Sequence, residues 1–72
     1  MEYLQFEFEI DSNEIVERLV ALLNDNGFEG FEESNTLKAF IKADAFDEQA
    51  FSEILNMFPT VNFTQTIIEN IN

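Results

Sequence analysis

The chain has 72 residues, with fifteen Asp and Glu against three Lys and Arg, and it contains neither His nor Cys. A chain of this length forms one domain at most, and without His or Cys it lacks the side chains of most nucleophilic, redox and thiolate metal sites. The formal net charge of -12 disfavours nucleic acid and anionic membranes as partners and favours a basic protein.

The N-terminal segment Tyr3–Ile10 alternates between apolar and polar residues, which predicts a half-buried strand. Its expected solvent face holds Tyr3, Gln5, Glu7 and Glu9. Asp11–Asn13 then offers capping residues for a helix with an apolar stripe from Ile15 to Leu23. Gly27 is suited to the left-handed backbone conformation that commonly ends such a helix.

A hairpin is expected next, because a second strand at Phe28–Ser34 and a third at Leu37–Lys42 flank the turn residues Asn35 and Thr36. Gly30 lies inside the second strand, and a glycine there indicates a bulge or an edge position. In the third strand the alternation places Lys38, Phe40 and Lys42 on one face.

A second helix follows, with Asp44 or Asp47 as its cap and Pro59 beyond its end. The β-prone segment 61–71 predicts a last strand of ambiguous register. The order strand, helix, strand, strand, helix, strand favours an α+β fold of the ferredoxin-like split βαβ type. We therefore expect a four-stranded antiparallel sheet with both helices on one face, formed by a single domain over residues 1–72.

In such a fold the first and third strands are central neighbours, so Tyr3, Glu7 and Glu9 would lie beside Lys38, Phe40 and Lys42 on the face that the helices leave open. One interpretation is a solvated face with cross-strand Glu–Lys pairs. The other is a docking surface, in which Tyr3 and Phe40 are aromatic anchors surrounded by charge.

Acidic side chains cluster along the chain at Glu29, Glu32, Glu33 and at Asp44, Asp47, Glu48. The spacing of a calcium-binding loop is absent, and solvated carboxylates and helix caps explain these residues. The two glycines do not form a phosphate-binding loop. We therefore expect no catalytic, metal-binding or cofactor-binding residue in this chain.

The chain also has more phenylalanine than so small a core readily accommodates. Phe6, Phe8, Phe51 and Phe58 are expected in the core. Five others are harder to place: Phe28, Phe31, Phe40, Phe46 and Phe63. Either their strand registers conceal further core positions, or some of them form one apolar patch that meets a partner or a missing domain.

Two runs of sequence resemble a known family. These are Gly27-Phe28-Glu29-Gly30-Phe31-Glu32-Glu33-Ser34 and, after it, Leu37-Lys38-Ala39-Phe40-Ile41. Together with the opening strand and the tail 67–72, they are similar to the N-terminal domain of bacterial ribosomal protein L-eleven methyltransferases. The resemblance covers nearly the whole chain, and its motifs are strand and hairpin patterns.

The resemblance implies a substrate-recognition domain that orients a basic ribosomal protein of the large subunit. In that family a separate C-terminal catalytic domain binds S-adenosylmethionine, so no catalytic residue is carried over to this chain, which alone would not be an enzyme. The expected partner contacts are Tyr3, Glu7, Glu9, Glu29, Glu32, Glu33 and Phe40. The alternative function is a free-standing acidic module that self-associates weakly through its open sheet face. For either function we expect a cytoplasmic protein, because there is no cysteine and no basic leader segment.

Overall fold

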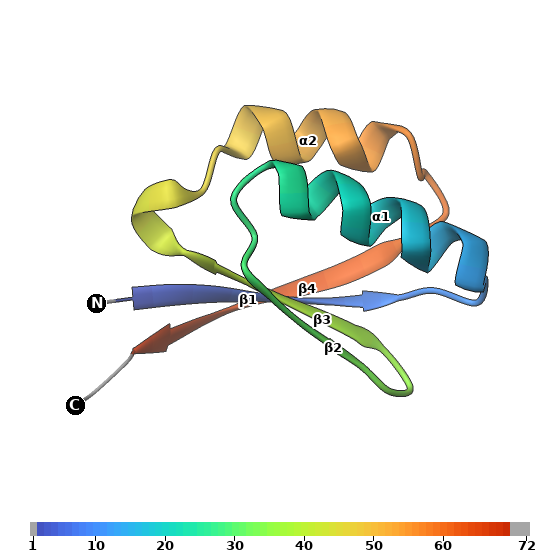
Figure 1. Cartoon of the computed structure of the whole chain (residues 1–72), viewed down its shortest axis with the longest axis horizontal. Coiled ribbons are helices and arrows are strands. Elements are labelled where there is room, and N and C mark those ends of the chain that lie inside the picture. The colour runs from blue at the N-terminus through green and yellow to red at the C-terminus, as the bar shows by residue number, and fades with distance from the viewer. Residues whose placement is uncertain (1, 70–72) are drawn as a thin grey trace.

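The computed structural model describes residues 2–69, which form one four-stranded sheet and two α-helices (Figure 1). The elements in chain order are β1 (Glu2–Glu9), α1 (Asn13–Asp25), β2 (Gly30–Glu33), β3 (Leu37–Lys42), a 3₁₀ turn η1 (Ala43–Ala45), α2 (Glu48–Asn56) and β4 (Asn62–Glu69). The predicted order of strands and helices is confirmed. The 3₁₀ turn was not predicted, and the expected end of the last strand at 70–71 lies outside the described residues.

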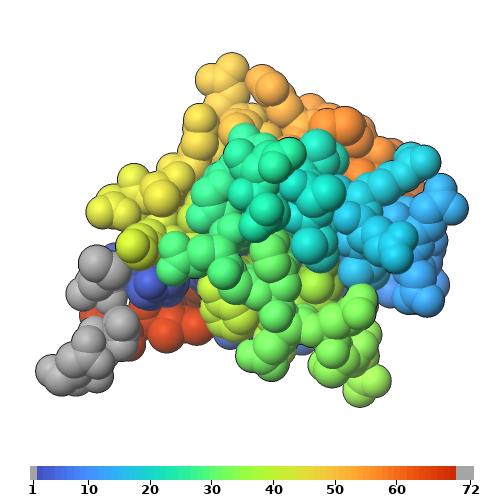
Figure 2. All heavy atoms as spheres, viewed as in Figure 1, coloured from blue at the N-terminus to red at the C-terminus, as the bar shows by residue number. Residues whose placement is uncertain are grey.

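The sheet is antiparallel throughout, with strand order β2-β3-β1-β4. This is the ferredoxin-like arrangement that the sequence predicts, with β1 and β3 in the centre. Both helices lie on the same side of the sheet, above the strands in Figure 1. The space-filling view shows α1 and α2 covering that side together (Figure 2). Within residues 2–69, no helix covers the opposite face of the sheet, which we call the open face.

The core lies between the helices and the inner face of the sheet. Its centre is Phe6, which is fully buried, with its ring centroid 4.6 Å from that of Phe51 on α2. The predicted core residues Phe8 and Phe58 are buried as well. Phe28 also belongs to the core, while Phe31 and Phe46 pack against it partly buried. Most of the phenylalanines that were hard to place therefore belong to the core or pack against it.

Helix α1 begins and ends where its capping residues predict. Ser12 is the N-cap, and its hydroxyl oxygen accepts a bond from the backbone N–H of Ile15 at 3.4 Å. At the other end Gly27 has a φ of +95°, and the N–H of Phe28 donates to the carbonyl of Leu23 at 3.1 Å. This is the longer of the two bonds of a Schellman motif, whose residue at the position of Gly27 must tolerate positive φ.

Helix α2 is capped by Asp47 rather than Asp44. One carboxylate oxygen of Asp47, Oδ1, accepts bonds from the backbone N–H groups of Gln49 at 3.0 Å and Ala50 at 3.1 Å. Asp44 lies in the 3₁₀ turn that leads from β3 to this helix. The helix ends at Asn56, and Pro59 lies in the turn that follows.

Strand β2 covers only Gly30–Glu33 of the predicted Phe28–Ser34, and its start is marked by a bulge. The N–H of Glu29 donates to the carbonyl of Phe40 at 3.0 Å, yet Gly30 is the residue that pairs with Phe40. Two residues of one strand thus oppose a single residue of its neighbour, which is the definition of a β-bulge. The glycine at position 30 indicated either a bulge or an edge strand. Both are found, because β2 begins with a bulge and lies at an edge of the sheet.

Candidate functional site

The open face of the sheet is defined by the strand registers. Tyr3, Gln5 and Glu7 on β1 pair with Lys42, Phe40 and Lys38 on β3, respectively. The face continues onto β4, where Thr66 and Ile68 pair with Gln5 and Tyr3. Side chains of paired residues lie on the same face of a sheet. The register therefore places Tyr3, Glu7 and Phe40 on the same face, as the sequence predicts.

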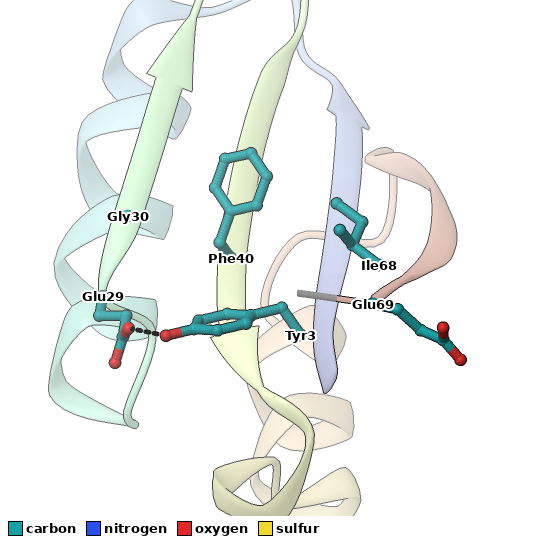
Figure 3. A pocket seen from close by; sticks show the side chains of 6 residues that line it. All are labelled: Tyr3, Glu29, Gly30, Phe40, Ile68 and Glu69. Carbon is teal, nitrogen blue, oxygen red and sulfur yellow. Dashed lines mark hydrogen bonds between the residues drawn. The ribbon is translucent and has the colours of Figure 1, made fainter. Parts of the chain in front are cut away.

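A shallow depression of about 370 Å³ lies on this face, which we call the Tyr3 depression. It is lined by Tyr3, Glu29, Gly30, Phe40, Ile68 and Glu69. The Tyr3 ring lies across β3, and its hydroxyl donates to Glu29 Oε1 at 2.9 Å (Figure 3). Phe40 stands beside the ring, whereas Glu69 points away from it (Figure 3).

The bulge explains how Glu29 reaches this face. A bulge re-aims a side chain relative to a regular strand, and here it directs the Glu29 carboxylate toward Tyr3. Gly30 has no side chain, and a Cβ built on it would come within 3.5 Å of the Phe40 ring. At this distance a Cβ would make an ordinary van der Waals contact with the ring, so the glycine leaves that space unfilled.

The hydrogen bond to Glu29 raises the pKa of Tyr3 above its ordinary value of 10.0. Desolvation adds to the increase, as do the negative charges of Glu29 and Asp44. Tyr3 is therefore a neutral hydrogen-bond donor at physiological pH.

The other predicted contact residues are spread over the sheet. Thr36 in the hairpin turn donates its hydroxyl to Glu7 Oε2 at 2.6 Å. Glu9 pairs with Asn62 at the far end of β1. Glu32 pairs with Lys38 on the open face, but Glu33 pairs with the buried Leu37 and so belongs to the helix-bearing side.

The three hairpin acids thus do not form one cluster, and only Glu29 joins Tyr3 and Phe40. The cross-strand Glu–Lys pairs of the solvated interpretation are found in the register, where Glu7 and Glu32 both lie opposite Lys38, but among residues 2–69 neither forms an ion pair within 4.0 Å. In residues 2–69 the one ion pair within 4.0 Å joins Arg18 to Glu14 on α1.

A second concave surface lies on the helix-bearing side, between α2 and β4. This α2–β4 groove of about 310 Å³ is lined by Phe46, Glu48, Phe51, Ser52, Leu55, Asn56, Phe63 and Gln65. The sequence did not single it out as a site. The one available signal was the difficulty of placing Phe46 and Phe63 in the core.

The described part of the chain shows no group of three or more acidic residues that could hold a metal ion. Within the same residues, neither helix is long and apolar enough to cross a membrane.

No family model matches the sequence, and no curated protein is significantly similar to it. Among solved structures, the fold is similar to that of a de novo designed protein, Foldit4. The TM-score is 0.56 at 12% sequence identity, and the match covers 97% of this chain and 98% of the designed one. This likeness shows the α+β fold alone, which the strand order β2-β3-β1-β4 identifies as ferredoxin-like. It gives no information on function, since one fold hosts many functions.

Proposed function

We propose that this chain is the substrate-recognition domain of a ribosomal protein methyltransferase in the cytoplasm. It holds a basic ribosomal protein of the large subunit on its open sheet face, so that a substrate amine reaches S-adenosylmethionine on a separate catalytic domain. Its contribution to the reaction is orientation, since holding two reactants in place removes much of the entropic cost of their meeting.

The observation that carries this proposal is the Tyr3 depression. It combines two aromatic side chains, Tyr3 and Phe40, with the carboxylate of Glu29 in a chain of net charge -12. Aromatic faces and carboxylates together bind the long aliphatic, positively charged side chains that a basic protein presents. Hot spots of protein interfaces typically combine such an aromatic anchor with a charged rim.

The test is a titration of the isolated domain with purified ribosomal protein L-eleven, followed by amide NMR. We expect resonances of Tyr3, Gln5 and Phe40 to shift. Phe40→Ala should weaken binding by about 1–2 kcal/mol, the cost typical of losing an interface anchor. Met57→Ala is the matched control, because Met57 is 58% exposed and apolar but lies beyond the end of α2. Shifts confined to the helix-bearing side, or unchanged affinity of Phe40→Ala, would exclude this docking mode.

A second candidate is weak self-association through the same face. The observation in its favour is that two of the three basic residues, Lys38 and Lys42, lie on this face among Glu7, Glu9 and Glu32. A face bearing both signs of charge can be complementary to its own copy. Sedimentation at increasing concentration distinguishes the two functions, because a recognition domain stays monomeric without its substrate.

A further inference from the structure

The two edge strands of the sheet differ in how they are protected. Strand β2 has four residues, begins with a bulge and carries Glu32 and Glu33, all features that discourage pairing with another chain. Strand β4 has eight residues and is uncharged from Asn62 to Ile68, with neither proline nor glycine. A long, uncharged and β-prone edge is the kind that accepts a further strand.

The backbone groups available on β4 follow from the ladder. The carbonyl of Phe40 accepts a bond from the N–H of Glu29, directly before β2, so the backbone groups of Phe40 point away from β1. In an antiparallel sheet the backbone N–H and C=O groups of successive residues point alternately to the two neighbouring strands. Because the groups of Phe40 point away from β1, those of its partner Gln5 point away from β3 and toward Thr66 on β4. The N–H and C=O groups of Gln65 and Ile67 therefore point to the free edge.

The α2–β4 groove lies on the helix-bearing side next to this edge. Phe51 and Phe63 both line it, with ring centroids 5.3 Å apart. Phe63 remains 40% exposed and Ile67 61% exposed, although their cross-strand partners Phe8 and Leu4 are buried in the core. The inner face of β4 thus has apolar surface that the helices do not cover.

The charges around the groove favour a basic occupant. Glu48 of α2 lines the groove, and at the end of β4 Glu69 pairs directly with Glu2 of β1. Like charges directly opposite each other are unfavourable, and a cation on an adjacent strand would relieve this repulsion. A second copy of this chain, with its own charge of -12, would add to the repulsion.

We propose that β4 and the α2–β4 groove bind an extended basic peptide segment by strand addition. The segment hydrogen-bonds to the outward backbone groups of Gln65 and Ile67, inserts an apolar side chain between α2 and Phe63, and places a Lys or Arg near Glu69 or Glu48. This site lies on the helix-bearing side and at the free edge of β4, and it shares only Glu69 with the Tyr3 depression. It stands whether or not the open face binds a ribosomal protein.

The test uses a capped eight-residue peptide in which threonine alternates with valine or leucine and which carries two lysines at one end. Its binding is measured by calorimetry and amide NMR on the isolated chain. We expect the amides of Phe63, Gln65 and Ile67 to shift. Two variant peptides carry methyl groups on the backbone nitrogens of one edge or of the other. At least one of them should bind about tenfold more weakly, because it has lost the N–H donors of its backbone bonds to β4.

Proline substitutions on β4 give a matched pair. Gln65→Pro removes an N–H that points to the free edge, so the fold should persist while the affinity for the peptide falls about tenfold. Thr66→Pro removes an N–H directed at β1 and should destabilise the fold instead. Ser52→Trp fills the groove from exposed helix surface and should also abolish binding, while Phe40→Ala on the open face should leave it unchanged.

Three results would overturn the proposal. The first is equal affinity for the parent and both methylated peptides, which would indicate attraction by charge alone. The second is a folded Gln65→Pro variant that binds the peptide normally. The third is a dimer of the free chain that protects the same β4 amides, which would make a second copy the occupant.

Discussion

Tyr3 shows how one side chain connects three strands. It belongs to β1, lies across β3 and donates to Glu29 at the start of β2. The hydrogen bond forms because the bulge at Glu29 and Gly30 turns the carboxylate toward the open face. Alternation in the sequence is sufficient to place Tyr3 and Phe40 on this face. The bulge requires the hairpin register, so the contact with Glu29 was not predicted.

The raised pKa of Tyr3 gives a direct test of this contact. The chain has one tyrosine and no tryptophan, so its alkaline ultraviolet titration reports Tyr3 alone. We expect a midpoint above 10.0, which Glu29→Ala should move back toward that value. Glu32→Ala is the control, because it removes an equal charge three residues along the same segment without removing the hydrogen bond.

The sign of the linked effect on stability follows from the direction of the shift. Because the pKa is higher in the folded state than in the unfolded chain, the contribution of Tyr3 is complete below pH 10.0 and is lost as pH rises through the folded pKa. An unshifted titration in the native protein would mean that Tyr3 and Glu29 are not bonded in solution.

At the scale of elements, the strands and helices with one clearly apolar face were predicted best. The strand at Leu37–Lys42 and the start of α1 agree with the structure, since a buried face and a capping residue determine them. Strand β4 was ambiguous because threonine and isoleucine suit either face of a sheet. Its register depends on pairing with β1, a contact between distant parts of the chain.

The helix caps allow a quantitative comparison. Asp47→Ala removes an acceptor for two backbone N–H groups and should lower the free energy of unfolding by about 1–2 kcal/mol. Ser12→Ala removes one longer bond, at 3.4 Å, and should cost about 0.5 kcal/mol. Asp44→Ala is the control, because Asp44 lies outside both caps, and its effect should be close to zero. Chemical denaturation measures all three, and a larger loss for Asp44→Ala than for Asp47→Ala would contradict the cap assignment.

At the scale of the whole molecule, the negative charge is distributed unevenly. The open face carries both lysines, whereas the helices and the turns that lead into them carry eight acids and one arginine: Asp11, Glu14, Glu17, Asp25, Asp44, Asp47, Glu48, Glu53 and Arg18. The total charge follows from the composition, and the fold that places these charges on the surface was predicted from the sequence. The sequence did not predict the α2–β4 groove, because a groove arises where two packed elements leave space between them. No local pattern encodes such a gap.

This distribution leads to a prediction about association with a basic protein. Charge on the whole molecule accelerates encounter, whereas contacts at the interface determine dissociation. At physiological salt the Debye length is about 8 Å, so distant charges are screened and association should slow as salt rises. The double variant Glu7→Lys, Glu9→Lys reverses two charges on the open face. The double variant Glu17→Lys, Glu53→Lys changes the net charge by the same amount, but on the helices.

If the open face is the dock, both double variants should slow association at low salt, and the open-face variant should slow it more. At high salt the helix variant should recover the normal rate and the normal affinity. The open-face variant should keep a faster dissociation, since its lysines remain at the interface. Stopped-flow kinetics over a range of salt concentrations measures these rates. Equal behaviour of the two variants at every salt concentration would mean that the charge acts only at long range, and that the partner docks on neither set of acids.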